Sequence, residues 1–314
     1  METEQLNTLI ESATSGDRSA LARTLSLLES GEAVADKVFH YLLETQRTSF
    51  VIGVTGAPGA GKSSLVGALI RMLRSAGERV AVIAVDPSSP FSEGALLGDR
   101  LRMTSGERDD GVFIRSMASR GKQGGMAAAT QTAALVLEAC DWPIVIIETV
   151  GAGQVEVDIA ATADATLVVV NPGWGDEVQA HKAGLMEVGD VFVINKADRD
   201  GTADTRRDLE SLLSKRAESA ATVSIVETIA TEDSGISDLW ERVLEHRSAI
   251  DAGGLIERRK AQARQLIQLA IEQQLSQKTA RLFASESFSD VIKKVTEGDR
   301  VMSTVVSDLL KKLA

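Results

Sequence analysis

The sequence predicts an α/β fold built on a doubly wound, mostly parallel β-sheet, with a helical extension at each end of the chain. Two observations predict it. Between about residues 50 and 250, short apolar runs rich in valine and isoleucine alternate with longer helical stretches. Such runs are typical of parallel strands that are covered on both faces. Outside that span, apolar residues recur every three to four positions, which is typical of amphipathic helices.

The length and composition are those of a folded protein. A chain of 314 residues is about twice a typical domain, so it predicts one large domain with appendages, or two domains. The 45 acidic and 34 basic residues give a formal net charge of −11, which argues against the phosphate backbone of nucleic acid as a partner. No apolar run reaches the ~18 residues that a membrane-spanning helix needs. We therefore expect neither a nucleic-acid partner nor a membrane.

The cysteine usage indicates the compartment. The single cysteine, Cys140, cannot form an internal disulfide, which favours a reducing environment. The first residues are acidic and mixed, and they lack the basic flank and apolar run of a signal peptide. We expect a cytoplasmic protein.

The periodicity divides the chain into three parts. Residues 1–48 form a helical extension, residues 49–252 form the α/β domain, and residues 253–314 form a helical arm that begins at a Gly253-Gly254 hinge. One helical stripe of the arm contains Leu266, Ile267, Leu269, Ala270 and Leu275. Such a stripe packs either on its own domain or against a second copy, and the periodicity leaves both open.

Seven strands are expected in the α/β domain. They are residues 50–54, 80–85, 112–114, 144–147, 165–170, 191–194 and 223–226. Ligands of open parallel sheets bind beyond the carboxyl ends of the strands. The residues that follow each strand are therefore the candidates for chemistry.

The first strand is followed by the strongest motif. Gly56, Gly61, Lys62 and Ser63 fit G-x-x-x-x-G-K-[ST], the P-loop, which predicts a P-loop NTPase fold. Its glycines let backbone N–H groups surround phosphate oxygens, the lysine bridges the β- and γ-phosphates, and the serine hydroxyl binds Mg²⁺. A chance glycine-rich turn is the alternative. The predicted phosphate-binding residues are Gly56, Ala57, Pro58, Gly59, Ala60, Gly61, Lys62, Ser63 and Ser64.

A second constellation follows the strand at 144–147. That strand places Glu148 at the carboxyl edge, where its carboxylate can hold Mg²⁺ through water. The N–H of Gly151 can reach the γ-phosphate, and Gln154 can orient a hydrolytic water. The alternative for Glu148 is a helix cap at the edge of the sheet. The predicted catalytic residues are Lys62, Glu148 and Gln154.

Two aspartates complete the predicted metal shell. Asp86 follows the strand at 80–85, and Asp99 lies thirteen residues further on. Hard oxygen ligands beside phosphates suit Mg²⁺, although a loop aspartate is also commonly a helix cap. The predicted metal ligands are Ser63, Asp86, Asp99 and Glu148.

The choice of base is predicted after the strand at 191–194, where Asn195, Lys196 and Asp198 form N-K-x-D. A carboxylate there can accept hydrogen bonds from guanine N1 and the 2-amino group, which adenine cannot donate. Asn195 can tie this loop to the phosphate loop. Backbone N–H groups near Ala230 and Thr231 are expected on the other side of the base. GTP and GDP are therefore expected as ligands in preference to adenine nucleotides.

Six motifs, in their order along the chain, resemble those of the methylmalonyl-CoA mutase-associated GTPases, the MeaB or ArgK family. They are GAPGAGKSS, AVDPSSP, LLGDRLRM, ETVGAGQ, NPGWGDEVQAHKAG and NKAD. The resemblance covers nearly the whole chain. It implies a GTPase that is homodimeric through its C-terminal helices and that chaperones an adenosylcobalamin-dependent acyl-CoA mutase, gating cofactor loading and protecting the mutase. It implies the Mg²⁺ and phosphate roles of Lys62, Ser63, Asp86, Asp99 and Glu148 and the base-recognition role of Asp198.

The resemblance also implies a switch loop at residues 171–182 that signals the nucleotide state to the mutase. Its predicted partner-contacting residues are Trp174, Asp176, Glu177 and Lys182. The bulky Trp174 is a departure from the pattern, and it is either an interface anchor or local core. The base-side segment IATEDSG is a second departure.

Two other functions share this core. A P-loop kinase of a small metabolite would make N-K-x-D accidental. A metallochaperone GTPase would need a histidine-rich tract or paired cysteine and histidine ligands, which one cysteine and three scattered histidines do not supply. No mutase or cobalamin-binding region is recognisable, so the mutase is expected to be a separate polypeptide.

Overall fold

A computed structural model describes residues 3–29, 49–86, 109–118, 125–149, 162–174, 179–214, 223–250, 252–283, 288, 291–292, 295–297 and 302–313. The chain divides into two compact units, Met1–Gln262 and Ala263–Ala314. The division of the sequence into residues 1–48, 49–252 and 253–314 stays a prediction.

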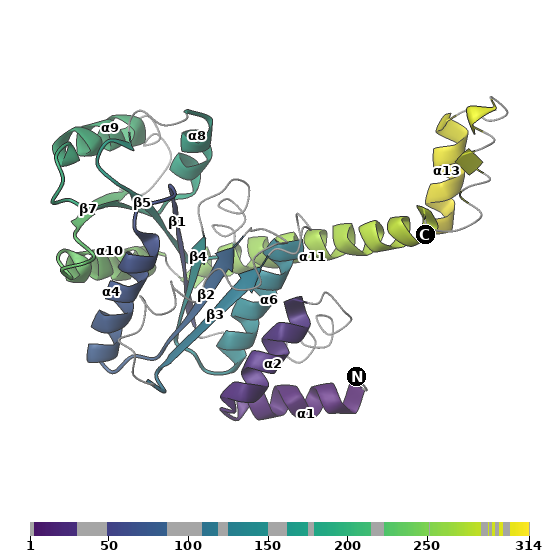
Figure 1. The fold of residues 1–314 in the computed structure, drawn as a ribbon, viewed down its shortest axis with the longest axis horizontal. Helices are drawn as coiled ribbons and strands as arrows, with labels where there is room; N and C mark the ends of the chain where they lie inside the picture. The colour runs from purple at the N-terminus through teal and green to yellow at the C-terminus, as the bar shows by residue number, and fades with distance from the viewer. Residues whose placement is uncertain are drawn as a thin grey trace. The chain divides into compact units, whose positions relative to one another are not determined.

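The first unit contains a seven-stranded sheet in the order β3-β2-β4-β1-β5-β6-β7 (Figure 1). The strands are β1 (Phe50–Gly56), β2 (Val80–Asp86), β3 (Val112–Ala118), β4 (Ile144–Thr149), β5 (Ala165–Val170), β6 (Val191–Asn195) and β7 (Ser224–Thr228). Every neighbouring pair is parallel. The predicted α/β P-loop NTPase fold is confirmed. The strand order reverses at β1, where open parallel sheets place their ligands.

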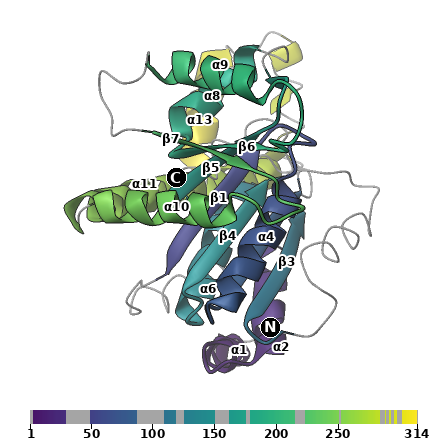
Figure 2. The same ribbon diagram turned by 90° about the vertical axis from the view of Figure 1, so that its left-hand side faces the viewer.

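The helices are α1 (Thr3–Thr14), α2 (Arg18–Glu29), α4 (Lys62–Ser75), α6 (Gly125–Ala139), α8 (Gln179–Val188), α9 (Thr202–Ser214), α10 (Ile236–Ala249), α11 (Ala252–Phe283) and α13 (Met302–Leu313). Helices α1 and α2 pack on each other, and α2 also contacts α6 and β3 (Figure 2). The described part of the N-terminal extension is helical, as predicted. No helix within the described ranges is long and apolar enough to cross a membrane.

Alternate residues of the strands enter two core clusters, because successive side chains of a strand point to opposite faces. Val169 and Val193 pack in the cluster that contains Leu65 of α4 and Leu239 of α10. The residues on the other face pack with Trp174 and with apolar residues of α8 and α9; they are Val168, Val170, Phe192 and Ile194. The sheet is therefore covered on both faces, which explains its nearly continuous apolar strands.

Two expectations about local structure are wrong. Strand β3 extends to Ala118, beyond the expected end at residue 114. Its polar Arg115 interrupts the apolar pattern, yet its Nη2 donates to Ser26 Oγ of α2 at 3.0 Å. Gly253 and Gly254 form no hinge, because α11 begins at Ala252 and contains them in its first turn. Glycine costs most in the interior of a helix, where its backbone entropy is lost, and these two glycines lie at the helix end.

The beginning of α11 is docked at the amino-terminal edge of the sheet. Arg258 Nη2 donates to both carboxylate oxygens of Asp190, at 2.9 and 3.1 Å. The same carboxylate accepts from Thr166 N at 2.9 Å, and its side chain is only 12% exposed. Nearby, burial raises the pKa of Asp164, although a hydrogen bond from Val51 N opposes that shift.

We expect Arg258→Ala to lower the free energy of unfolding by about 2 kcal/mol, because it leaves a mostly buried carboxylate without its arginine partner. Urea denaturation followed by circular dichroism measures the loss. The control is Arg242→Ala, which removes a solvent-exposed pair with Glu245 within α10 and should cost less than about 0.5 kcal/mol. Equal losses in the two variants would show that the docking contact adds nothing.

Candidate nucleotide-binding site

The loop between β1 and α4 has a backbone that only glycine accommodates at its two ends. Gly56 has φ 134°, and a Cβ there would lie 2.0 Å from the Val169 carbonyl oxygen. Gly61 has φ 91°, and a Cβ there would lie 2.4 Å from Asn195 Nδ2. Helix α4 begins at Lys62, directly after this loop. The loop and the positive end of the helix together make an arrangement that binds phosphate.

The side chain of Lys62 is hydrogen-bonded to the backbone of the phosphate loop. Its Nζ donates to Gly56 O at 2.7 Å and to Ala57 O at 2.9 Å. The residue is 6% exposed. The loop therefore surrounds a buried ammonium group, which can exchange carbonyl oxygens for phosphate oxygens without leaving its position.

Two of the predicted metal ligands are in contact. Ser63 Oγ donates to Glu148 Oε1 at 2.6 Å, although the residues lie 85 positions apart in the chain. Glu148 belongs to β4 and is 5% exposed. A hydroxyl and a carboxylate are hard oxygen donors, and Mg²⁺ at phosphate sites is typically held by one or two such groups together with the phosphates. This donor pair fits Mg²⁺.

Asp86 lies at the same edge of the sheet. It is the last residue of β2, and the preceding Val85 pairs with Thr149 of β4. The parallel register thus brings the backbone of Asp86 beside the end of the strand that carries Glu148. Asp99, Gly151, Gln154, Asp176 and Glu177 lie outside the described residues; Lys182 lies on α8, and its side chain is not described.

Asn195 joins three loops of the site. Its Nδ2 donates to Ala60 O at 2.9 Å, and its Oδ1 accepts from Thr228 Oγ1 and Ala230 N, both at 3.2 Å. The residue is 2% exposed. The predicted tie between N-K-x-D and the phosphate loop is confirmed. Sequence reasoning missed Thr228, because no motif spacing singles it out.

In the rest of the N-K-x-D motif, the Lys196 side chain is bonded to the phosphate loop and the Asp198 carboxylate is exposed to solvent. Lys196 adopts φ 60°, and its Nζ donates to Gly59 O at 2.6 Å. Asp198 and Thr231 are both exposed. The N–H of Ala230, expected to face the base, instead donates to Asn195. In this conformation Ala230 holds the loop, while Asp198 and Thr231 are accessible to a ligand.

Trp174 is buried at 7% exposure. It packs in the core cluster that contains Val168, Val170, Leu185, Phe192, Ile194, Leu209 and Leu213. The backbone around it is held as well, since Gly173 N donates to Thr205 Oγ1 at 3.2 Å. Of the two alternatives for Trp174, the structure favours local core over an interface anchor.

The lone cysteine is unsuited to metal binding. Cys140 is 8% exposed, and burial raises the pKa of its thiol to about 12. A thiol with that pKa stays protonated near neutral pH, whereas a cysteine binds metal as the thiolate. This observation weighs against the metallochaperone alternative.

Comparisons with known proteins agree with this geometry. The family model described as "Methylmalonyl Co-A mutase-associated GTPase MeaB" matches residues 21–283. A protein of Pyrococcus abyssi named as a GTPase is 41% identical over 313 residues, covering 98% of this chain and 97% of that protein. The GTPase ArgK of Escherichia coli is 35% identical over 282 residues, covering 87% and 85% of the two chains.

A solved structure supports the fold. The crystal structure of a LAO/AO transport system kinase superposes with a TM-score of 0.69 at 25% identity, covering 100% of this chain and 99% of that one. The family model covers most of the chain, and the relatives match over most of their own lengths. The protein is therefore a GTPase, and it belongs to the family of methylmalonyl-CoA mutase-associated GTPases, MeaB.

Proposed function

We propose that this GTPase works with Mg²⁺ as a cytoplasmic chaperone of a separate adenosylcobalamin-dependent acyl-CoA mutase, coupling GTP binding and hydrolysis to cofactor loading and to protection of the mutase. The match of residues 21–283 to the family of mutase-associated GTPases carries the proposal, and one contact within the site supports its nucleotide part. In a chain whose family is named for the mutase, Asn195 ties the predicted guanine loop directly to the phosphate loop, with Nδ2 2.9 Å from Ala60 O. A rearrangement of the phosphate loop can therefore pass directly to the loop that binds the base.

The phosphate half of the site supports GTP hydrolysis. Lys62 holds an ammonium group at the centre of the loop, where it binds the β- and γ-phosphates and stabilises charge that develops between them. Ser63 and Glu148 would hold Mg²⁺, which when bound neutralises phosphate charge. Asp86 and Asp99 complete the proposed metal shell, Gly151 contacts the γ-phosphate and Gln154 orients the attacking water.

The base half of the site supports guanine. Asp198 accepts from N1 and the 2-amino group of the base, and the stem of Lys196 lies against the purine face. Exposure of Asp198 and the anchoring of Lys196 to Gly59 O are consistent with these roles. Thr231 completes the base site, while Ala230 holds the loop through its bond to Asn195.

Communication with the mutase is proposed to run through residues 171–182. Because Trp174 is core, the contacts with the partner fall to Asp176, Glu177 and Lys182, which supply charge of both signs. Trp174 instead anchors the beginning of the loop to the face of the sheet on which α8 and α9 pack.

The second unit supports a homodimer. Ile267, Ile271 and Leu275 recur every four residues along α11 and are 58%, 55% and 46% exposed. A row of large apolar side chains at this spacing lies on one face of a helix and costs free energy in water. A second copy of the same helix would cover it, which agrees with dimerisation through the C-terminal helices.

A binding assay tests the partner. Tagged chain, purified with Mg²⁺, is mixed with purified methylmalonyl-CoA mutase and either GDP or a non-hydrolysable GTP analogue, and the complex is measured by size-exclusion chromatography with light scattering. We expect a complex whose amount depends on the nucleotide, and none of that dependence in Lys62→Ala. A mutase that never co-elutes, under any nucleotide, would contradict the chaperone role.

A further inference from the structure

The turn between β7 and α10, residues 229–235, has a tightly constrained backbone. Ile229 and Ser234 form an antiparallel bridge, and Glu232 N donates to Ile229 O at 2.9 Å. Asp233 has φ 55°, and Gly235 has φ 74° with a would-be Cβ 2.1 Å from Glu227 O. The backbone of this turn is thus defined by its own hydrogen bonds and by two residues in the left-handed region.

Two side chains from outside the turn, one in the N-K-x-D loop and one on α4, hold it in place. On one side, Asn195 Oδ1 accepts from Ala230 N at 3.2 Å. On the other side, Arg71 Nη2 reaches Ala230 O at 3.4 Å and Asp233 Oδ1 at 2.5 Å, and Arg71 Nε donates to Asp233 Oδ2 at 3.3 Å. The planar guanidinium thus spans the turn, with a fork on its carboxylate and a contact to its backbone.

Arg71 belongs to α4, the helix that begins at Lys62. One rigid helix therefore supplies the phosphate-binding lysine at its beginning and a clamp on the base-side turn two and a half turns later. We propose that Arg71 is a positioning residue for guanine recognition: it fixes residues 229–235 so that the exposed Thr231 meets the base opposite Asp198. This inference rests on the proposed base site.

The size of the effect follows from exposure. The Arg71 and Asp233 side chains are 45% and 54% exposed, so solvent screens their attraction. The fork itself restricts the geometry of the turn more than a single contact would. We expect loss of the clamp to weaken GTP binding about three- to tenfold rather than to abolish it.

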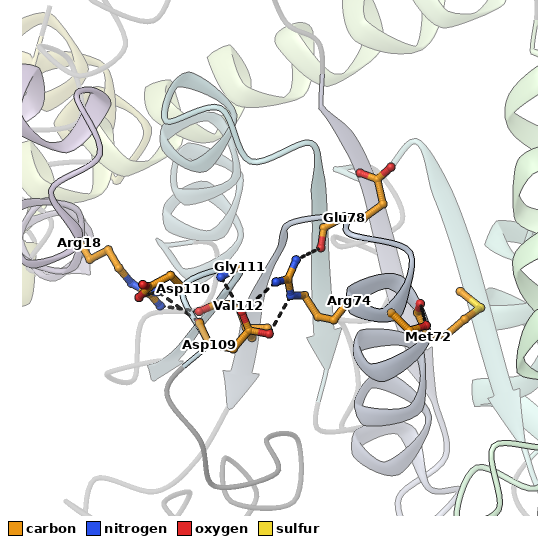
Figure 3. Close-up of polar contacts among 9 residues, drawn as sticks. Arg18, Met72, Arg74, Glu78, Asp109, Asp110, Gly111 and Val112 are labelled. Carbon is orange, nitrogen blue, oxygen red and sulfur yellow. Dashed lines mark hydrogen bonds and ion pairs between the residues drawn. The ribbon is translucent and has the colours of Figure 1, made fainter.

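The same helix offers a matched control. Arg74, three residues further along α4, forms a comparable fork with Asp109, Nε to Oδ2 at 2.7 Å and Nη2 to Oδ1 at 2.9 Å (Figure 3). This hydrogen-bonded pair lowers the pKa of the Asp109 carboxyl. It ties α4 to the chain before β3 and not to the base-side turn. Removing it breaks an ion pair of the same kind on the same helix.

The test compares steady-state GTP hydrolysis and release of a fluorescent GDP analogue in the full-length chain. For Arg71→Ala we expect KM for GTP and the GDP release rate to rise about three- to tenfold while kcat stays within about twofold. Asp233→Asn keeps a residue that tolerates positive φ, and it should match Arg71→Ala; the double variant should add nothing further. Arg71→Lys should lie in between, and Arg74→Ala should leave KM unchanged.

Unchanged KM in Arg71→Ala, or an equal rise in Arg74→Ala, would overturn the positioning role. Inorganic tripolyphosphate, which engages only the phosphate loop, should inhibit the wild type and Arg71→Ala at the same concentration; a matching loss of its binding would show a general defect of α4 and overturn the inference. If the wild type binds GDP and ADP equally, the proposed base recognition itself fails and takes this inference with it.

Discussion

Replacing Lys62 by alanine should lower GTP turnover by at least about 10²-fold and abolish measurable GTP binding, because it removes the one buried cation of the phosphate loop. The Lys62 ammonium lies 2.7 Å from Gly56 O and 2.9 Å from Ala57 O, so the same change also removes the internal support of the loop. Phosphate release and the fluorescence of a bound guanine nucleotide measure the two losses.

Ser75→Ala is the control for this change. It lies at the far end of the same helix, where its Oγ donates to Met72 O within α4 at 2.6 Å. We expect that variant to bind and hydrolyse GTP as the wild type does. The thermal midpoint of Lys62→Ala should fall only modestly, because the change removes a local support of the loop and leaves the contacts of the sheet in place. GTP turnover that survives in Lys62→Ala would disprove the assignment of the phosphate site.

Asp198→Asn should weaken GTP binding by about 10² to 10⁴-fold, the range expected when a site built to accept hydrogen bonds loses its acceptor. An amide at this position donates where the carboxylate accepted. Xanthosine triphosphate carries an oxygen in place of the 2-amino group of guanine, so it should gain affinity in the variant. Competition of the two nucleotides for a fluorescent ligand measures the exchange of preference.

The control for the base site is Asp200→Asn, two residues further along the same exposed loop. It removes the same charge without touching the N-K-x-D motif, and we expect it to keep its affinity for GTP. Equal weakening by the two variants would mean that loop charge, and not a contact with the base, produces the effect.

The phosphate and base motifs could be predicted from the sequence because each is a local pattern after an apolar strand. The parallel sheet then brings the ends of these strands to one edge, which is why Ser63 and Glu148 meet at 2.6 Å and Asn195 reaches Ala60. The chemistry of each residue type and the topology of the sheet were sufficient for this part of the site.

Contacts that depend on which face of a helix meets which turn could not be predicted. Arg71 and Asp233 lie 162 residues apart, and neither belongs to a motif. For Trp174 the sequence leaves an interface anchor and local core both open, and only the packing with apolar residues of β5, β6, α8 and α9 decides for local core. Arg115 lies within β3, paired with Ile83 of β2, and its side chain donates to a hydroxyl of α2. Each depends on packing between distant segments.

The relative rate of GTP and ATP hydrolysis tests whether one site both binds phosphates at Lys62 and recognises the base at Asp198. Both nucleotides are supplied separately to the purified chain with Mg²⁺ and without any acceptor. We expect a kcat/KM for GTP that exceeds that for ATP by about 10³-fold or more. Equal values, or a preference for ATP, would contradict it.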